Sequence, residues 1–211
     1  EDGFRATELA FYELLAPFAP TGIDIKAALT ATERANLHTY GYGVKAFGLS
    51  MVEAAITISQ GQVPTEVLAH LIQLTRDLLL APVRLLDGVP EVLQELAKSH
   101  RLVLITKGDL VHQTRKVTTS GLDHLFEHVE IVLEKDVATY AKVLRDISVQ
   151  PEKVCMVGNS VKSDILPILE LGGHAVHIPY HFLWELEQAE HPPLSPRFGE
   201  LRNINELPAW I

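Results

Sequence analysis

The hydrophobic pattern of this 211-residue chain changes its period near Pro82, and no single type of secondary structure fits both sides of that change. From residue 5 to about residue 80, apolar side chains recur at helical spacing, and proline and glycine residues divide the stretch into four segments. Four consecutive helices without a strand predict a small bundle that needs a second domain to rest on. We therefore predict an all-helical domain over residues 1–82.

Beyond Pro82, short and fully apolar runs alternate with helical patterns. The runs with the length and composition of strands are residues 101–106, 129–133, 154–157 and 175–178. The helical patterns are residues 89–98, 109–120, 137–147 and 163–171. Strands that are apolar on both faces and alternate with helices are typical of a parallel sheet covered on both sides. Residues 83–211 are therefore predicted to form a doubly wound, Rossmann-like α/β domain.

Composition narrows the range of partners. The formal net charge is −9, and no block of Lys or Arg suggests a nucleic-acid or membrane surface. Cys155 is the only cysteine, which excludes an internal disulfide and a cysteine-rich metal site and fits a reducing cytoplasm. No apolar run approaches the ~18 residues of a membrane-spanning helix. We expect a cytoplasmic monomer or homodimer with a small-molecule substrate.

Polar residues follow two of the predicted strands in a way that suits an anionic ligand. In a doubly wound sheet, ligands bind at the carboxyl ends of the strands. Thr106, Lys107 and Gly108 follow the first run, where a hydroxyl and free N–H groups can hold a phosphoryl oxygen. Lys135 follows the second run and could offset the charge of an anion. Taken alone, Thr106 fits a helix cap and Lys135 fits an ordinary surface lysine.

A third strand end carries oxygen ligands. Gly158 can turn the chain sharply off the strand, and Asn159 and Asp164 then offer hard oxygen donors that suit Mg²⁺. An Asn-Ser turn with Ser163 or Asp164 as the cap of the next helix explains the same residues. Without context, the two interpretations are equally good.

The order of these residues supplies the context. Thr106, Lys135 and the pair Asn159 and Asp164 each follow a β-run of one predicted sheet, and together they resemble motifs II, III and IV of the haloacid dehalogenase-like (HAD) superfamily. The segments 85–93 and 150–160 are also similar to that superfamily, and the helical half resembles its inserted cap domain. The resemblance implies an α/β core with an all-helical cap, and it specifies no substrate.

The chain departs from the superfamily pattern in two places. Asn159 stands where Asp is usual, which removes one negative charge from the expected metal site. Motif I, an Asp-x-Asp strand that carries the nucleophile, occurs nowhere in the 211 residues. In this fold that strand lies between the strands that end at Thr106 and Gly158, and without it two inner strand edges would lack partners. We expect the natural protein to carry this strand immediately before Glu1.

The resemblance implies a hydrolase that attacks its substrate with an aspartate carboxylate. For a phosphatase acting on a small phosphorylated metabolite, Asn159 and Asp164 would position Mg²⁺, Thr106 would hold phosphoryl oxygens with the neighbouring backbone, and Lys135 would offset charge. Two rivals remain open: a metal-free 2-haloacid dehalogenase, and a non-catalytic binding protein on the same fold. Asp164 favours the phosphatase.

The ten histidines do not predict a metal site. No His-x-x-x-His pair occurs on one predicted helix face, so we expect no dedicated histidine site. His174, His177 and His181 flank the run at 175–178 and precede an aromatic segment. Packing of a C-terminal extension is the favoured interpretation, with Tyr180 and His181 at the rim of the site as the alternative.

Overall fold

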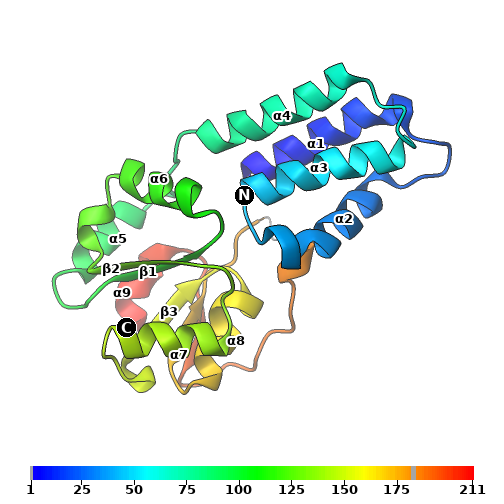
Figure 1. Cartoon of the computed structure of the whole chain (residues 1–211). Helices are drawn as coiled ribbons and strands as arrows, with labels where there is room; N and C mark the ends of the chain where they lie inside the picture. The colour runs from blue at the N-terminus through cyan, green and yellow to red at the C-terminus, as the bar shows by residue number, and fades with distance from the viewer. Residues whose placement is uncertain (1, 182–183) are drawn as a thin grey trace. The chain divides into compact units, whose positions relative to one another are not determined.

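The computed structural model describes residues 2–181 and 184–211. The chain divides into two compact units (Figure 1). One comprises Glu1–Pro82 and Gly108–Gln113, and we call it the helical unit; the other comprises Val83–Lys107 and Thr114–Ile211, and we call it the α/β unit. Within the described residues, no helix combines the length and apolar character needed to cross a membrane.

The helical unit is built from four long helices and one short turn of 3₁₀-helix. They are α1 (Asp2–Leu15), η1 (Ala16–Phe18), α2 (Ile25–Tyr40), α3 (Val44–Ile58) and α4 (Thr65–Leu80). The Asp24 side chain caps α2 by accepting the backbone N–H of Ala27 at 3.0 Å. Gly41, with φ of 69°, ends the same helix in a conformation that favours glycine.

One apolar cluster forms the core of the helical unit. It contains Phe11, Leu15, Leu29, Phe47, Met51, Ala54, Ala55, Ile58 and Leu71. Gly48 lets α3 and α4 approach closely, because a Cβ atom there would lie 2.4 Å from the Thr75 methyl carbon. Burial of apolar area, at about 25 cal/mol per Å², is therefore the main force that holds these helices together.

The α/β unit alternates strands and helices. Its longer elements are α5 (Val89–Leu96), β1 (Val103–Lys107), α6 (Leu110–Ser120), β2 (His128–Val132), α7 (Val137–Asp146), β3 (Cys155–Gly158), α8 (Leu166–Glu170), β4 (His174–His177), β5 (Phe198–Glu200) and α9 (Leu207–Trp210). Its short turns are η2 (Asp123–Leu125), η3 (Pro151–Lys153), η4 (Val161–Ile165), η5 (Glu185–Glu187) and η6 (Ile204–Glu206). The first four residues of α6 are assigned by their contacts to the helical unit.

Every pairing between these named strands is parallel. β1 pairs with β2, in a register that sets Thr106 opposite Ile131. β3 pairs with β4, and β4 pairs with β5, so the order in the second sheet is β3-β4-β5. The prediction of an α/β fold with parallel strands is confirmed. Among the described residues no ladder joins β1 to β3, and the additional strand expected between them stays a prediction.

Two apolar clusters support the strands. Tyr140, Leu144, Ile165, Ile168, Ala175 and Phe198 form one, and Val92, Leu96, Val176 and Leu207 form the other. Gly199 admits the indole of Trp210, because a Cβ atom there would lie 2.4 Å from Nε1 of the ring. α9 and the three-residue strand β5 were not predicted from the sequence, since elements this short carry almost no periodic signal.

The helix predicted over residues 163–171 was wrong at its start. Residues Val161–Ile165 form a π-helical turn, and α8 begins only at Leu166. The Ser160 hydroxyl caps the turn by accepting the N–H of Ser163 at 3.0 Å, and Pro167 occupies the first turn of α8. A π-turn is often associated with functional sites, and this one carries Asp164.

Candidate active site

A buried ion pair joins the segments that follow β2 and β3. Lys135 Nζ lies 2.7 Å from Asp164 Oδ1, and the two side chains are 13% and 6% exposed. The other carboxylate oxygen of Asp164 accepts the backbone N–H of Ser160 at 3.0 Å. Because both oxygens are held, the carboxylate is fixed in orientation before any ligand arrives.

Gly158 is required by the position of Asp164. A Cβ atom on Gly158 would lie 2.2 Å from Oδ2 of Asp164, so any other residue at this position would clash with the carboxylate. The sequence suggested that this glycine served a sharp turn, but the structure shows that it permits close approach of a carboxylate. The Tyr140 hydroxyl supports the same loop by donating to the Ser163 carbonyl at 3.0 Å. Burial raises the pKa of Tyr140, so its hydroxyl stays a proton donor.

A second buried lysine connects the end of β1 to the same loop. Lys107 Nζ lies 3.0 Å from Glu134 Oε1, 3.1 Å from Ser163 Oγ and 2.6 Å from Glu187 Oε1. Its side chain is 11% exposed, so these contacts replace most of the water that would solvate its charge. Lys107 therefore ties β1 to the π-turn and to the C-terminal segment.

Glu187 is a site residue that the sequence did not indicate. Its carboxylate accepts hydrogen bonds from Ser160 at 2.7 Å and from Ser163, in addition to the contact with Lys107. Burial of Glu187 favours the protonated form, but the hydrogen bonds from Lys107, Ser163 and Ser160 outweigh it and hold the pKa below its usual value. The carboxylate comes from a one-turn 3₁₀-helix in an irregular segment, where no motif or period marks it.

The remaining predicted site residues lie on the adjoining strand ends. Thr106 is the penultimate residue of β1, and Gly108 follows that strand with φ of 139°, a conformation that favours glycine. Asn159 follows β3 directly, and its backbone carbonyl lies 3.2 Å from Nε2 of His177. The contacts described above thus bring Lys135 to Asp164, whereas Thr106 and Asn159 are placed by their strands.

The cluster carries opposite charges in close contact. Two lysines face three carboxylates, from Glu134, Asp164 and Glu187. Such a group can attract a hard cation to its oxygens and can offset the charge of an anion with its ammonium groups. The carboxylates and the ammonium groups both lie near the carboxyl ends of β1, β2 and β3.

Comparison with known proteins bears on the family of this chain. The family model described as haloacid dehalogenase-like hydrolase matches residues 8–172. A solved haloacid dehalogenase-like family hydrolase from Xanthomonas campestris is 36% identical, with a TM-score of 0.87 over 99% of this chain and 82% of that one.

Two curated proteins are also similar. They are glyceraldehyde 3-phosphate phosphatases, from Methanothermobacter thermautotrophicus (32% identical over 53% of this chain and 50% of that protein) and from Pyrococcus furiosus (31% over 49% and 46%). The chain therefore spans about half the length of the curated relatives it matches. The parallel strands, the order of the site residues and the extent of the family match lead to one conclusion: this chain belongs to the haloacid dehalogenase-like hydrolases.

Proposed function

We propose that this hydrolase is a Mg²⁺-dependent phosphatase acting on a small phosphorylated metabolite. The observation that carries the proposal is the buried Lys135–Asp164 ion pair at the strand ends. An ion pair with so little exposure costs desolvation energy that a purely structural contact seldom recovers, so a chemical role is the better explanation.

The donor set fits Mg²⁺. The Asp164 carboxylate is preoriented, and each of its oxygens retains a lone pair beyond the hydrogen bond it accepts. Asn159 adds a neutral oxygen from the same loop, and carboxylate and amide oxygens are the ligands that Mg²⁺ prefers. When bound, the ion would polarise the phosphoryl oxygens and offset their charge.

The roles of the other residues follow from their positions. In the proposed reaction an aspartate carboxylate of the kind that motif I carries attacks phosphorus while the bond to the leaving alcohol oxygen breaks. That oxygen takes up a proton, and water later hydrolyses the acyl phosphate. Thr106 and the Gly108 backbone N–H would hold the phosphoryl oxygens, and Lys135 would keep the nucleophile ionised and offset developing charge.

Lys107 is better suited to holding the neighbouring loop in place than to contacting the substrate. The sequence suggested it as a substrate ligand because of its place beside Thr106. Its ammonium group is already held by Glu134 and Glu187, so a substrate would have to compete with two carboxylates. We assign Lys107 to holding the π-turn that carries Asp164.

The substrate class rests on the relatives. Two curated proteins that are about one-third identical over half this chain act, by their names, on glyceraldehyde 3-phosphate. We propose a small phosphorylated metabolite for this chain, with the helical unit as a cap that selects it.

The test is product analysis with the natural full-length protein. It would be incubated with a panel of small phosphate monoesters and with 2-chloropropionate, with and without MgCl₂. We expect orthophosphate release that requires Mg²⁺, and no chloride. Chloride release without metal would establish a 2-haloacid dehalogenase, and neither product would establish a non-catalytic relative.

A further inference from the structure

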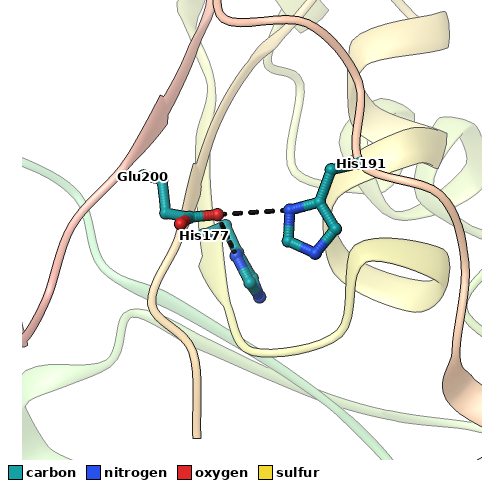
Figure 2. Close-up of side chains that lie close together, drawn as sticks. All are labelled: His177, His191 and Glu200. Atoms are coloured by element: carbon teal, nitrogen blue, oxygen red, sulfur yellow. Dashed lines mark hydrogen bonds and ion pairs between the residues drawn. The ribbon is translucent and has the colours of Figure 1, made fainter.

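Three metal-ligating side chains meet outside the candidate active site. His177 is the last residue of β4, Glu200 is the last residue of β5, and His191 lies in the irregular segment between them. Figure 2 shows Glu200 facing both imidazoles: Oε2 lies 2.9 Å from His177 Nδ1 and 3.2 Å from His191 Nδ1. One ligand atom from each residue lies within 4.8 Å of the others.

Both ring nitrogens of His177 face hydrogen-bond acceptors. Its Nε2 lies 3.2 Å from the Asn159 carbonyl, and its Nδ1 faces the Glu200 carboxylate. Both neighbours are acceptors, and a neutral imidazole has only one N–H to donate. With that proton directed at Asn159, Nδ1 presents a lone pair to a carboxylate, which is repulsive unless a second proton or a metal ion lies between them.

The second acceptor is ionised. The contact with His177 holds the pKa of Glu200 below its usual value, so the carboxylate is charged at neutral pH. His191 Nδ1 approaches the same oxygen, and its ring meets that of His177 edge to face, with centroids 4.9 Å apart. Two imidazole nitrogens therefore lie close to one carboxylate oxygen, with the three ligand atoms within 4.8 Å of one another.

We propose that His177, His191 and Glu200 bind a divalent transition-metal ion of the Zn²⁺ class. Two imidazoles and one carboxylate are a ligand set that Zn²⁺ accepts, with bonds of about 2.0–2.2 Å. Tetrahedral geometry then places ligand atoms about 3.3 Å apart, close to the 2.9 and 3.2 Å contacts between Glu200 and the two histidines. His191 and Glu200 are 54% and 44% exposed, which leaves a solvent-facing position for a water ligand.

The site has a feature that ordinary ion pairs lack. A histidine ligand to metal almost always donates its other N–H to a carbonyl or carboxylate, which fixes the tautomer and the ring plane. The Asn159 carbonyl stands in that position for His177. The proposed ion differs from Mg²⁺ in chemistry, because imidazole ligands suit Zn²⁺ and Mg²⁺ prefers oxygen.

A bound ion would hold the segment of residues 184–197 against the sheet. His191 lies shortly after Glu187, which that segment brings to Lys107, Ser160 and Ser163. The ion would thus hold in place the segment that supplies a buried carboxylate to the candidate active site. This role needs no assumption about the reaction that the enzyme catalyses.

The test is calorimetric titration of the metal-free full-length protein with ZnCl₂, in the presence of excess MgCl₂. We expect one Zn²⁺ per chain that Mg²⁺ does not displace. His191→Ala and Glu200→Gln each alter an exposed ligand and should weaken binding at least about tenfold, since even loss of an outer partner costs that much. His124→Ala changes an exposed histidine in the same unit and should bind Zn²⁺ as the parent does.

A second readout separates binding from folding. Zn²⁺ should slow protease cleavage within residues 184–197 of the parent and of His124→Ala, and should have no such effect in His191→Ala. Equal Zn²⁺ affinity in parent and His191→Ala, or no stoichiometric binding by the parent, would overturn the proposal. The three side chains would then be a hydrogen-bonded ion cluster alone.

Discussion

The two units differ in what they bury. The helical unit is held by a continuous apolar cluster, in which Phe11, Met51 and Leu71 are almost fully covered. The α/β unit buries two apolar clusters, but also Asp164 and Glu187, both close to the carboxyl ends of strands. Buried charges contribute little net stability and are costly when a partner is lost. Glu33 of the helical unit is buried as well, so the distinguishing feature of the α/β unit is that its buried acids gather at strand ends, where ligands bind in parallel sheets.

The largest expected effect is loss of the Asp164 carboxylate. Asp164→Ala leaves the Lys135 ammonium buried without its partner, and breaking such a pair costs about 3–5 kcal/mol of unfolding free energy. Both tryptophans, Trp184 and Trp210, lie in the α/β unit, so denaturant unfolding followed by their fluorescence reports on that unit.

The matched control is an exposed pair in the same unit. Lys142 and Asp146 form an i,i+4 ion pair at 2.7 Å with both side chains largely solvated. Asp146→Ala should cost far less unfolding free energy than Asp164→Ala, because solvent screens an exposed ion pair. Equal costs for Asp164→Ala and Asp146→Ala would remove the distinction between buried and surface charge.

Glu187→Gln is expected to destabilise the α/β unit by about 1.5–3 kcal/mol at neutral pH, because hydrogen bonds to a charged group are weakened. The folded pKa of Glu187 is depressed, so its contribution is present above the ordinary glutamate pKa of ~4.3 and is lost as pH falls through the folded value. Tryptophan-detected unfolding of parent and variant should therefore converge on acidification. A difference in unfolding free energy between parent and variant that stays constant as the pH falls below ~4 would contradict this expectation.

In the helical unit, the test is a substitution that disturbs packing and leaves charge unchanged. Gly48→Ala places a methyl group against Thr75 and should cost about 1–3 kcal/mol, the usual cost of overpacking. Thr75→Ala in the same chain should recover part of the loss, since it removes the two nearest atoms. Because no charge is involved, the cost should not change with salt. Unfolding would be followed by far-UV circular dichroism, and a cost that salt abolishes would show that the core is not governed by packing.

The same contrast explains what the sequence could predict. Helices of about 15 residues and apolar strands carry strong periodic signals, so the change of architecture near Pro82 was visible. The rule that ligands gather at strand ends selected Lys135 and Asp164, which the structure joins in an ion pair. These predictions depend on local patterns and on a general property of parallel sheets.

Other features depend on contacts between distant segments. Glu187 reaches the site from an irregular segment, and its partner Lys107 lies 80 residues earlier in the chain. The ligands His177 and Glu200 come from different strands, with a separation of 23 residues that no metal-binding motif describes. Gly158 was identified as a turn residue, although its role is to leave space for a carboxylate. Only the folded chain brings these atoms together.

The most direct test of the central claim is the Mg²⁺ dependence of phosphatase activity in the natural full-length protein. The initial rate of p-nitrophenyl phosphate hydrolysis would be measured against MgCl₂ concentration for the parent, Asp164→Ala, Asp164→Asn and Asn159→Asp, after fluorescence has shown each variant to be folded. Asp164→Asn serves as the isosteric variant if Asp164→Ala is too unstable.

Neutralising Asp164 is expected to abolish Mg²⁺-dependent hydrolysis, because the site loses its preoriented carboxylate. Asn159→Asp should preserve the activity or reach half-maximal rate at lower MgCl₂, because it adds a charged oxygen ligand. An unchanged Mg²⁺ dependence in folded Asp164→Asn would remove Asp164 from the metal site and contradict the account.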